Sequence, residues 1–209
     1  MSGNRTRDME VDKEVVSFLD KEVYPRIGAE IKRYTDLETQ MKGVDISFSY
    51  KSLNKVSVDE KTLTHYINKN LPTFAFELSF INKGNTVEGW FTDTRKVTEY
   101  YMIIWLWAEK EWDIKCSDIN HAQLYLVSRS KVSTYLKENG FDTDTLRKKA
   151  LKIREADIEG PLEKGSHSGF YFYYSKQLIE MPINVVLSKS ILKSLADYTF
   201  AGPNRFTNV

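Results

Sequence analysis

Hydrophobic and polar positions alternate most clearly in residues 43–61. Apolar side chains recur at a spacing of two in each half, with acidic or hydroxyl side chains between them; the apolar positions are Val44, Ile46, Phe48 and Tyr50, then Val56 and Val58. Because strand side chains point alternately to opposite faces, the pattern predicts a hairpin with one apolar face and one polar face. With a turn centred near Leu53, antiparallel pairing places Asp45 opposite Asp59–Lys61.

The rest of the chain shows a mixture of strand and helix periodicity. A helix ended by Pro25 is expected over about 11–24, and residues 26–42 are expected to form a loop with a helical turn. Strands are expected at 73–81, 87–92, 117–127 and 170–174, with a last strand ending at 187. Residues 97–107 form a continuously apolar run for which a buried strand is favoured, while periodicity alone leaves a helix as the alternative. Helices are expected at 130–139, 144–157 and 188–198. No repeat or low-complexity linker interrupts the chain, so a disordered lead-in over 1–10 and one α/β domain over 11–209 are predicted.

Composition narrows the function classes. The chain has 209 residues and a formal net charge of +1, so any nucleic-acid surface must be a local patch. Cys116 is the only cysteine, which excludes an intrachain disulfide and a cysteine-based zinc site and suits a reducing cytoplasm. The longest apolar run, Tyr100–Ala108, is shorter than the roughly 18 residues of a membrane span. A cytoplasmic protein without a membrane segment or signal peptide is expected.

The polar face of the predicted hairpin carries the candidate chemistry. Asp45, Asp59 and Lys61 share this face, whereas Glu60 points to the other face of a regular strand. Two carboxylates beside an ammonium group are suited to holding a divalent cation and stabilising developing negative charge. The alternative interpretation is a cross-strand ion pair on a solvated face, which would contribute about 0.2–1 kcal/mol.

The same residues resemble the PD-(D/E)xK nuclease superfamily, the fold of many restriction endonucleases and Holliday-junction resolvases. The pattern of that family is a helix, a strand beginning in Asp, and a strand ending in Asp/Glu-x-Lys, which Asp45 and Asp59–Lys61 match here. The lead-in Arg33-Tyr34-Thr35-Asp36, with Gln40 before Gly43, is similar to that of bacterial and phage members. The sequence departs from the pattern at Val44, where the family often has Pro, and at Glu60, where an apolar residue is commoner.

This resemblance implies a fold, a cofactor and a set of roles. The fold would be a restriction-endonuclease-like α/β core, with a central mixed sheet flanked by helices over 11–107 and a C-terminal α/β elaboration over 108–209. Mg²⁺ or Mn²⁺ would be held by Asp45 and Asp59, with the backbone carbonyl of Glu60 as a further ligand. Lys61 would orient or help to deprotonate the attacking water.

A first-helix acid is also common in the family. Glu22 falls within the apolar arc of the predicted helix, whereas Glu14 falls outside it, so Glu22 is the expected additional ligand. Glu77 lies among small and polar side chains of its predicted strand and is a further candidate catalytic acid. A competing alignment makes Asp59 the first acid and Glu77 the second, but it leaves Ser79 where the lysine should be.

The predicted helix at 144–157 is basic, and its Arg147, Lys148, Lys149 and Lys152 are candidate phosphate-binding residues. The alternative is that these side chains form a solvated face. The expected function is a metal-dependent endonuclease that hydrolyses phosphodiester bonds in DNA, with RNA as another substrate and a homodimer as the family's common assembly. A catalytically inactive nuclease-fold module that binds nucleic acid or protein is the second hypothesis. An α/β interaction protein unrelated to nucleases is the third.

Overall fold

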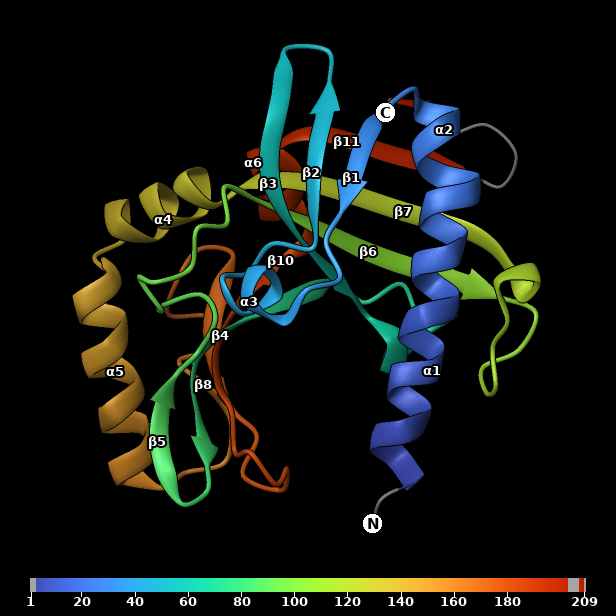
Figure 1. Cartoon of the computed structure of the whole chain (residues 1–209). Helices are drawn as coiled ribbons and strands as arrows, with labels where there is room; N and C mark the ends of the chain where they lie inside the picture. Colours follow the sequence, from blue (N-terminus) through green and yellow to red (C-terminus); the bar gives the residue numbers. More distant parts are fainter. Residues whose placement is uncertain (1–2, 203–206, 209) are drawn as a thin grey trace. The chain divides into compact units, whose positions relative to one another are not determined.

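The protein has an α/β fold in which helices flank two β-sheets, as a computed structural model of residues 3–202 and 207–208 shows (Figure 1). The chain divides into two compact units. The first contains the described residues of Met1–Leu71, Thr98–Ser128 and Ala196–Val209, and the second contains Pro72–Val97 and Arg129–Leu195. Neither unit is continuous in sequence, and the single domain expected over 11–209 stays a prediction.

The first unit is built on a seven-stranded mixed sheet in the order β1-β2-β3-β6-β7-β11-β12. Its strands are β1 (Glu30–Arg33), β2 (Ile46–Tyr50), β3 (Leu53–Thr62), β6 (Tyr100–Ala108), β7 (Ile119–Ser128), β11 (Ala196–Gly202) and β12 (Thr207–Asn208). Strands β3 and β6 run parallel, and every other neighbouring pair is antiparallel. The parallel pair is possible because the chain leaves this sheet after β3 and returns at β6 by way of strands of the second unit.

A long helical run covers one face of this sheet (Figure 1). Its parts are α1 (Gly3–Phe18), the π-helical turn η1 (Leu19–Val23) and α2 (Tyr24–Ile27). Val15, Leu19 and Val23 of this run are buried against sheet residues such as Phe48 and Val58. The apolar face of the hairpin therefore meets a core, as its alternation predicts. The unit also contains α3 (Leu37–Met41), η2 (Thr64–Tyr66) and η3 (Cys116–Asp118).

The helical run begins earlier than expected, and a strand follows it where a loop was predicted. The helix starts at Gly3, so the described residues of the expected disordered lead-in are helical, while residues 1–2 lie outside the described part. Within the expected loop 26–42, Glu30–Arg33 forms β1 and pairs with β2. A four-residue segment with one apolar side chain is too short for its sequence pattern to predict an edge strand. It is a strand because it pairs with β2.

Pro25 does not end the helical run, contrary to the prediction. The amide of Tyr24 donates to the carbonyl of Leu19, five residues back, so the wider π turn changes the bonding pattern just before the proline. Pro25 then occupies the first turn of α2, where its missing N–H is tolerated. The run ends at Gly28, whose φ of +72° is the left-handed conformation that glycine adopts readily.

The predicted hairpin forms and its register falls within the predicted range, but its turn lies at residues 51–52, just before the expected centre at Leu53. Ile46 pairs with Val58 and Phe48 with Val56, and the chain turns between Tyr50 and Leu53. This register sets Asp45, the residue before β2, opposite the position of Asp59, and the Asp45 amide donates to the Val58 carbonyl at 2.9 Å.

The second unit contains a five-stranded antiparallel sheet in the order β5-β4-β10-β9-β8. Its elements are β4 (Thr73–Asn82), β5 (Asn85–Glu88), β8 (Gly160–Leu162), β9 (Phe170–Tyr174), β10 (Ile183–Ser188), α4 (Arg129–Glu138), α5 (Thr143–Ala156) and α6 (Lys189–Leu195). Helix α5 contacts β4 and β10, and it buries Leu146, Ala150 and Ile153. Phe74, Phe76 and Leu78 on β4 are buried at alternate positions, as predicted.

Most other predicted elements are confirmed, with two informative exceptions. Strand β5 ends at Glu88 instead of 92, and the chain then forms turns through residue 97. The helix expected over 188–198 ends at Leu195, because Ala196–Gly202 becomes β11 and pairs with β7. Within the described residues, no helix is both long enough and apolar enough to cross a membrane.

Candidate functional site

Asp45 and Asp59 come together on one face of the β2–β3 pair, the face opposite the α1 helix. The two side chains are close enough that the charge of Asp45 and hydrogen bonding between the two carboxyls both raise the pKa of Asp59. The Oδ2 atom of Asp45 also accepts the backbone amide of Glu60 at 2.8 Å. The pairing of β2 with β3 thus holds two acids in direct contact, because residues opposite each other on antiparallel strands are close neighbours.

Lys61 completes this cluster, which we call the acidic pair site (Asp45, Asp59 and Lys61). Its Nζ lies 2.8 Å from Oδ1 of Asp59, two residues earlier on the same strand. The Lys61 side chain is 25% exposed and that of Asp59 only 8%, so the lysine forms the more accessible edge of the site. The alternation in sequence therefore places all three expected residues on one face.

The surroundings of Asp59 favour its protonated form. Burial, followed by the nearby charge of Asp45, raises the pKa of Asp59 to about 6, although Lys61 acts in the opposite direction. Two adjacent carboxylates repel each other when both are ionised, and Lys61, 2.8 Å from Asp59, gives only partial compensation, because the pKa of Asp59 is still raised. A proton supplies the remaining compensation below about pH 6, and a cation would supply it above that pH.

Glu60 points to the opposite face of β3, as expected for the intervening residue of a regular strand. There it forms a largely buried cluster with Tyr24, Arg33 and Asp20, of which only the Asp20 side chain is as much as 33% exposed; we call this cluster the buried tetrad. The Nη1 and Nη2 atoms of Arg33 lie 2.5 and 3.2 Å from the two Glu60 oxygens. The Nε and Nη2 atoms of the same guanidinium lie 2.8 and 2.6 Å from the two Asp20 oxygens. The hydroxyl of Tyr24 also donates to Glu60.

The protonation states in the tetrad depend on burial and on this bonding. Burial raises the pKa of Glu60, but the Arg33 and Tyr24 hydrogen bonds act against that rise. Burial and the charge of Glu60 raise the pKa of Tyr24 well above its usual range, so its hydroxyl stays a donor. Although burial alone would lower the pKa of Arg33, the bonds to Asp20 and Glu60 raise it, and the guanidinium stays charged.

Glu22 lies elsewhere. It forms an exposed ion pair with Arg26, one helical turn ahead, and no hydrogen bond or ion pair of the described residues joins it to the acidic pair site. Asp20 is instead the helix acid that reaches the sheet. Sequence reasoning missed it because the π turn at Leu19–Val23 shifts the helical phase after Phe18, so a regular 100° wheel assigns the wrong acid to the inner face.

Glu77 belongs to the second unit, whereas the acidic pair site is formed by the first unit alone. It lies half-buried on β4, and its backbone carbonyl accepts the amide of Phe91 at 3.1 Å. A Cβ on Gly89 would lie 2.3 Å from that carbonyl oxygen, so only glycine permits this close approach. The described contacts of Glu77 thus hold the turns of residues 89–97 against β4.

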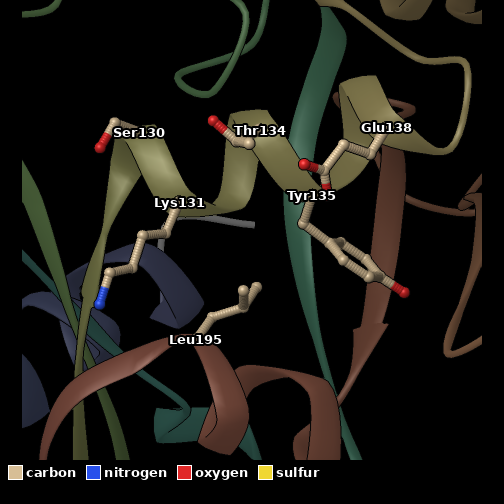
Figure 2. Close-up of a pocket in the computed structure, with 6 residues that line it drawn as sticks. All are labelled: Ser130, Lys131, Thr134, Tyr135, Glu138 and Leu195. Atoms are coloured by element: carbon tan, nitrogen blue, oxygen red, sulfur yellow. The ribbon is translucent and has the colours of Figure 1, made fainter.

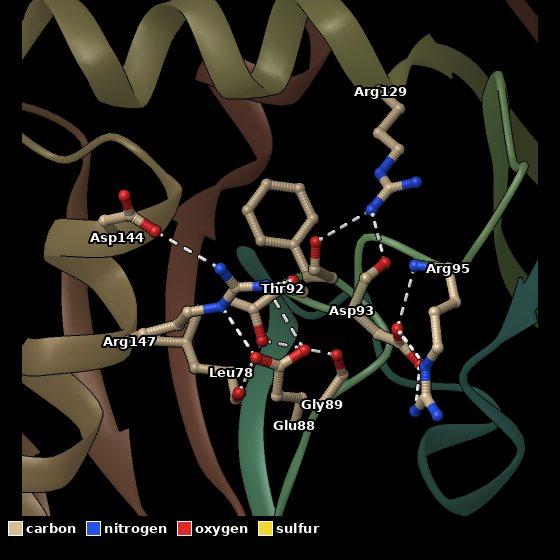
Figure 3. Close-up of polar contacts among 10 residues, drawn as sticks. Leu78, Glu88, Gly89, Thr92, Asp93, Arg95, Arg129, Asp144 and Arg147 are labelled. Atoms are coloured by element: carbon tan, nitrogen blue, oxygen red, sulfur yellow. Dashed lines mark hydrogen bonds and ion pairs between the residues drawn. The ribbon is translucent and has the colours of Figure 1, made fainter.

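Two of the four candidate phosphate-binding residues on α5 have partners inside the second unit, and Figure 3 shows those of Arg147. Arg147 forms ion pairs with Glu88 at 2.8 Å and Asp144 at 3.2 Å, and it donates to the Thr92 carbonyl. Lys149 forms an ion pair with Glu163 and lies over the ring of Phe172. These contacts hold neighbouring segments to α5.

Lys148 and Lys152 are exposed and remain the accessible cations of the expected set. They lie four residues apart on one side of α5, a spacing at which helical side chains are neighbours. The basic helix therefore has an inner set of cations that stabilise the unit and an outer pair that faces solvent.

The second unit also has a pocket of about 240 Å³ (Figure 2). It is formed by one side of α4 together with Leu195, and its charged lining consists of Lys131 and Glu138. With a single carboxylate, this pocket has no equivalent of the paired acids of the first unit.

The donor set of the acidic pair site fits a hard divalent cation. Mg²⁺ is commonly held by one or two carboxylates, with water and substrate phosphate completing its shell. Within residues 3–202 and 207–208, no group of three or more His, Cys, Asp and Glu side chains is arranged to hold a metal ion. The fit therefore depends on Asp45 and Asp59, whose mutual repulsion a cation would relieve. Comparisons with protein-family profiles, curated proteins and solved structures found no match for this chain.

Proposed function

We propose that this protein is a Mg²⁺-dependent nuclease that hydrolyses phosphodiester bonds in DNA by means of an activated water. The observation that carries the proposal is the contact between Asp45 and Asp59 beside Lys61 on one strand face. This arrangement supports the PD-(D/E)xK resemblance, since the matching residues meet in space. A restriction-endonuclease-like core in the first unit is part of the same proposal.

Each residue of the site has a role in this proposal. Asp45 and Asp59 would hold the cation, with the backbone carbonyl of Glu60 as a third oxygen. The cation would polarise the scissile phosphate and activate the attacking water. Lys61, held 2.8 Å from Asp59, orients that water and offsets the negative charge that develops on the phosphate.

The test uses the full chain, Mn²⁺ binding followed by electron paramagnetic resonance, and cleavage of plasmid DNA and of an RNA substrate with Mg²⁺. We expect Asp59→Asn to lose Mn²⁺ binding and to lower cleavage by about 10³-fold or more, and Lys61→Ala to lower cleavage by about 10²–10³-fold. Asp113→Asn is the matched control, because the Asp113 side chain is 86% exposed and the same chemical change should leave both readouts unaltered.

Urea denaturation of each variant separates lost activity from lost folding. A wild-type protein that binds no Mn²⁺ and cuts neither nucleic acid would overturn the enzymatic proposal. If that protein still bound DNA, the result would select the non-catalytic binding module. Replacing the exposed Lys148 and Lys152 by Ala then tests α5 as the DNA contact, for which weaker binding at unchanged stability is expected.

A further inference from the structure

Asp45 is held by two backbone amides that belong to, or adjoin, the buried tetrad. The Glu60 amide donates to the Asp45 carboxylate at 2.8 Å. The amide of Tyr34, the residue after Arg33, donates to the Asp45 backbone carbonyl at 2.8 Å. The position of Asp45 thus depends on where residues 33–34 and 60 are fixed.

The guanidinium of Arg33 fixes both residue 60 and its own segment, residues 33–34. Arg33 at the end of β1 bonds Glu60 on β3, although β2 lies between these strands in the sheet. From the helical run, Asp20 accepts hydrogen bonds from Arg33, and Tyr24 donates one to Glu60. A side chain clamped from a second strand and from a helix leaves its backbone amide little freedom to reorient.

Stability alone does not account for this arrangement. The Glu60 and Arg33 side chains are only 7% and 17% exposed, and the desolvation of such a buried ion pair often exceeds its Coulombic gain. An apolar side chain at position 60 would face the same core without that penalty. What the charged cluster provides is therefore a fixed orientation of groups at the neighbouring acidic pair site.

We propose that Tyr24 and Arg33 are positioning residues: by clamping the Glu60 side chain on the helix-covered face of β3, they fix the amide that orients the Asp45 carboxylate on the opposite face. This inference deepens the proposed function, and only its metal-binding readout rests on that function.

Hydrogen exchange of single amides tests the clamp directly. In Tyr24→Phe, and more strongly in Arg33→Lys, the Glu60 and Tyr34 amides should exchange at least about 10-fold faster than in the wild type. The Leu63 amide, which bonds the Ile104 carbonyl, serves as the internal reference and should change much less. Val15→Ala is the matched control, because it removes buried packing from the same helical run outside the tetrad.

Two further readouts separate positioning from a general structural role. A double-mutant cycle of Tyr24→Phe with Asp45→Asn should show coupling of about 3-fold or more in the unfolding equilibrium constant, whereas independent roles would be additive. The Mn²⁺ dissociation constant should rise by about 10-fold in Tyr24→Phe and stay constant in Val15→Ala.

The outcomes are distinguishable. Faster exchange of both amides with the expected coupling supports the clamp even if the wild type binds no Mn²⁺, in which case only the proposed function fails. If Tyr24→Phe and Arg33→Lys lower stability but leave the exchange of both amides as in Val15→Ala, with additive energies, the clamp is disproved whatever the metal results.

Discussion

The end of strand β3 carries one charged cluster on each face, and each cluster combines two acids with one base. Asp20, Glu60 and Arg33 lie on the helix-covered face, where five hydrogen bonds from Arg33 and Tyr24 reach the two acids. On the other face the acids of the acidic pair site contact each other, and the pKa of Asp59 rises to about 6. The two clusters thus have the same formal charge. On one face the carboxylates are fully hydrogen-bonded, whereas on the other they favour the binding of a proton or a cation.

This comparison shows that donor geometry decides what buried acids do. A planar guanidinium with five N–H donors serves two carboxylates at once, whereas a single ammonium on a flexible stem bonds Asp59 and leaves the contact between the acids in place. The first arrangement is suited to structure and the second to binding.

The largest expected effect is the loss of Arg33. Arg33→Met leaves Asp20 and the buried Glu60 without their charged partner, which should lower the free energy of unfolding by about 3–5 kcal/mol. Urea denaturation measures this loss. Arg26→Met is the matched control, because the Arg26–Glu22 pair is exposed and should contribute less than about 1 kcal/mol. Equal losses in the two variants would contradict the contrast between buried and exposed pairs.

The second effect is a pH dependence that originates at Asp59. Its pKa is raised from the ordinary 3.8 to about 6, so the folded state binds the proton more tightly than the unfolded chain does. The resulting stabilisation is complete below about pH 4 and is lost as the pH rises through about 6, by about 3 kcal/mol in total.

Denaturation of the wild type and of Asp59→Asn from pH 4 to 8 measures this dependence. As the pH rises across that interval, the unfolding free energy of the wild type should fall relative to that of Asp59→Asn. The difference between the two proteins should level off above about pH 7. Taking the difference removes the contribution of other carboxyls, such as that of Asp93, whose pKa a hydrogen bond to Arg95 lowers. Parallel curves would show that Asp59 titrates normally.

A third effect is stabilisation by the cation itself. At pH 7.5 and a Mg²⁺ concentration tenfold above its dissociation constant, the wild type should gain about 1.4 kcal/mol of unfolding free energy. Asp59→Asn should gain little, because one of the two carboxylates is removed. The Asp113→Asn variant should respond like the wild type, and an equal gain in all three proteins would indicate a general salt effect.

The smallest expected effect concerns Glu22. Because this side chain pairs with Arg26 on the surface, Glu22→Gln should lower the unfolding free energy by no more than about 0.5 kcal/mol. Its Mn²⁺ affinity, measured by titration, should match that of the wild type. A weakened affinity would return Glu22 to the set of metal ligands that the family resemblance implies.

Local patterns were sufficient where an element is amphipathic, and they favoured the correct structure for one uniformly apolar run. The alternation around Asp45 and Asp59 predicted a hairpin whose register falls within the expected range, and the apolar run ending at Ala108 is the buried strand β6. Patterns failed where pairing with a distant segment decides the structure. The first residues of β11, Ala196–Tyr198, were predicted as the end of a helix, but β11 pairs with β7.

The candidate site divides in the same way. Asp45, Asp59 and Lys61 follow from a period of two along one hairpin, so neighbours in sequence determine which face they share. Asp20, Tyr24 and Arg33 do not, because a π turn changes the helical phase and an unpredicted edge strand presents the guanidinium. The basic helix was predicted correctly as a helix, but its inner cations are paired with acids that are distant in sequence, such as Glu88 and Glu163.

The sequence by itself determined an α/β protein with a hairpin whose polar face gathers two acids and a lysine, because strand geometry is local and its side chains alternate. Only the tertiary structure decided the division into two discontinuous units, the parallel β3–β6 pair and the buried tetrad behind the hairpin. These features join segments far apart in the chain, and their energies come from packing and ion pairing that no short window of residues contains.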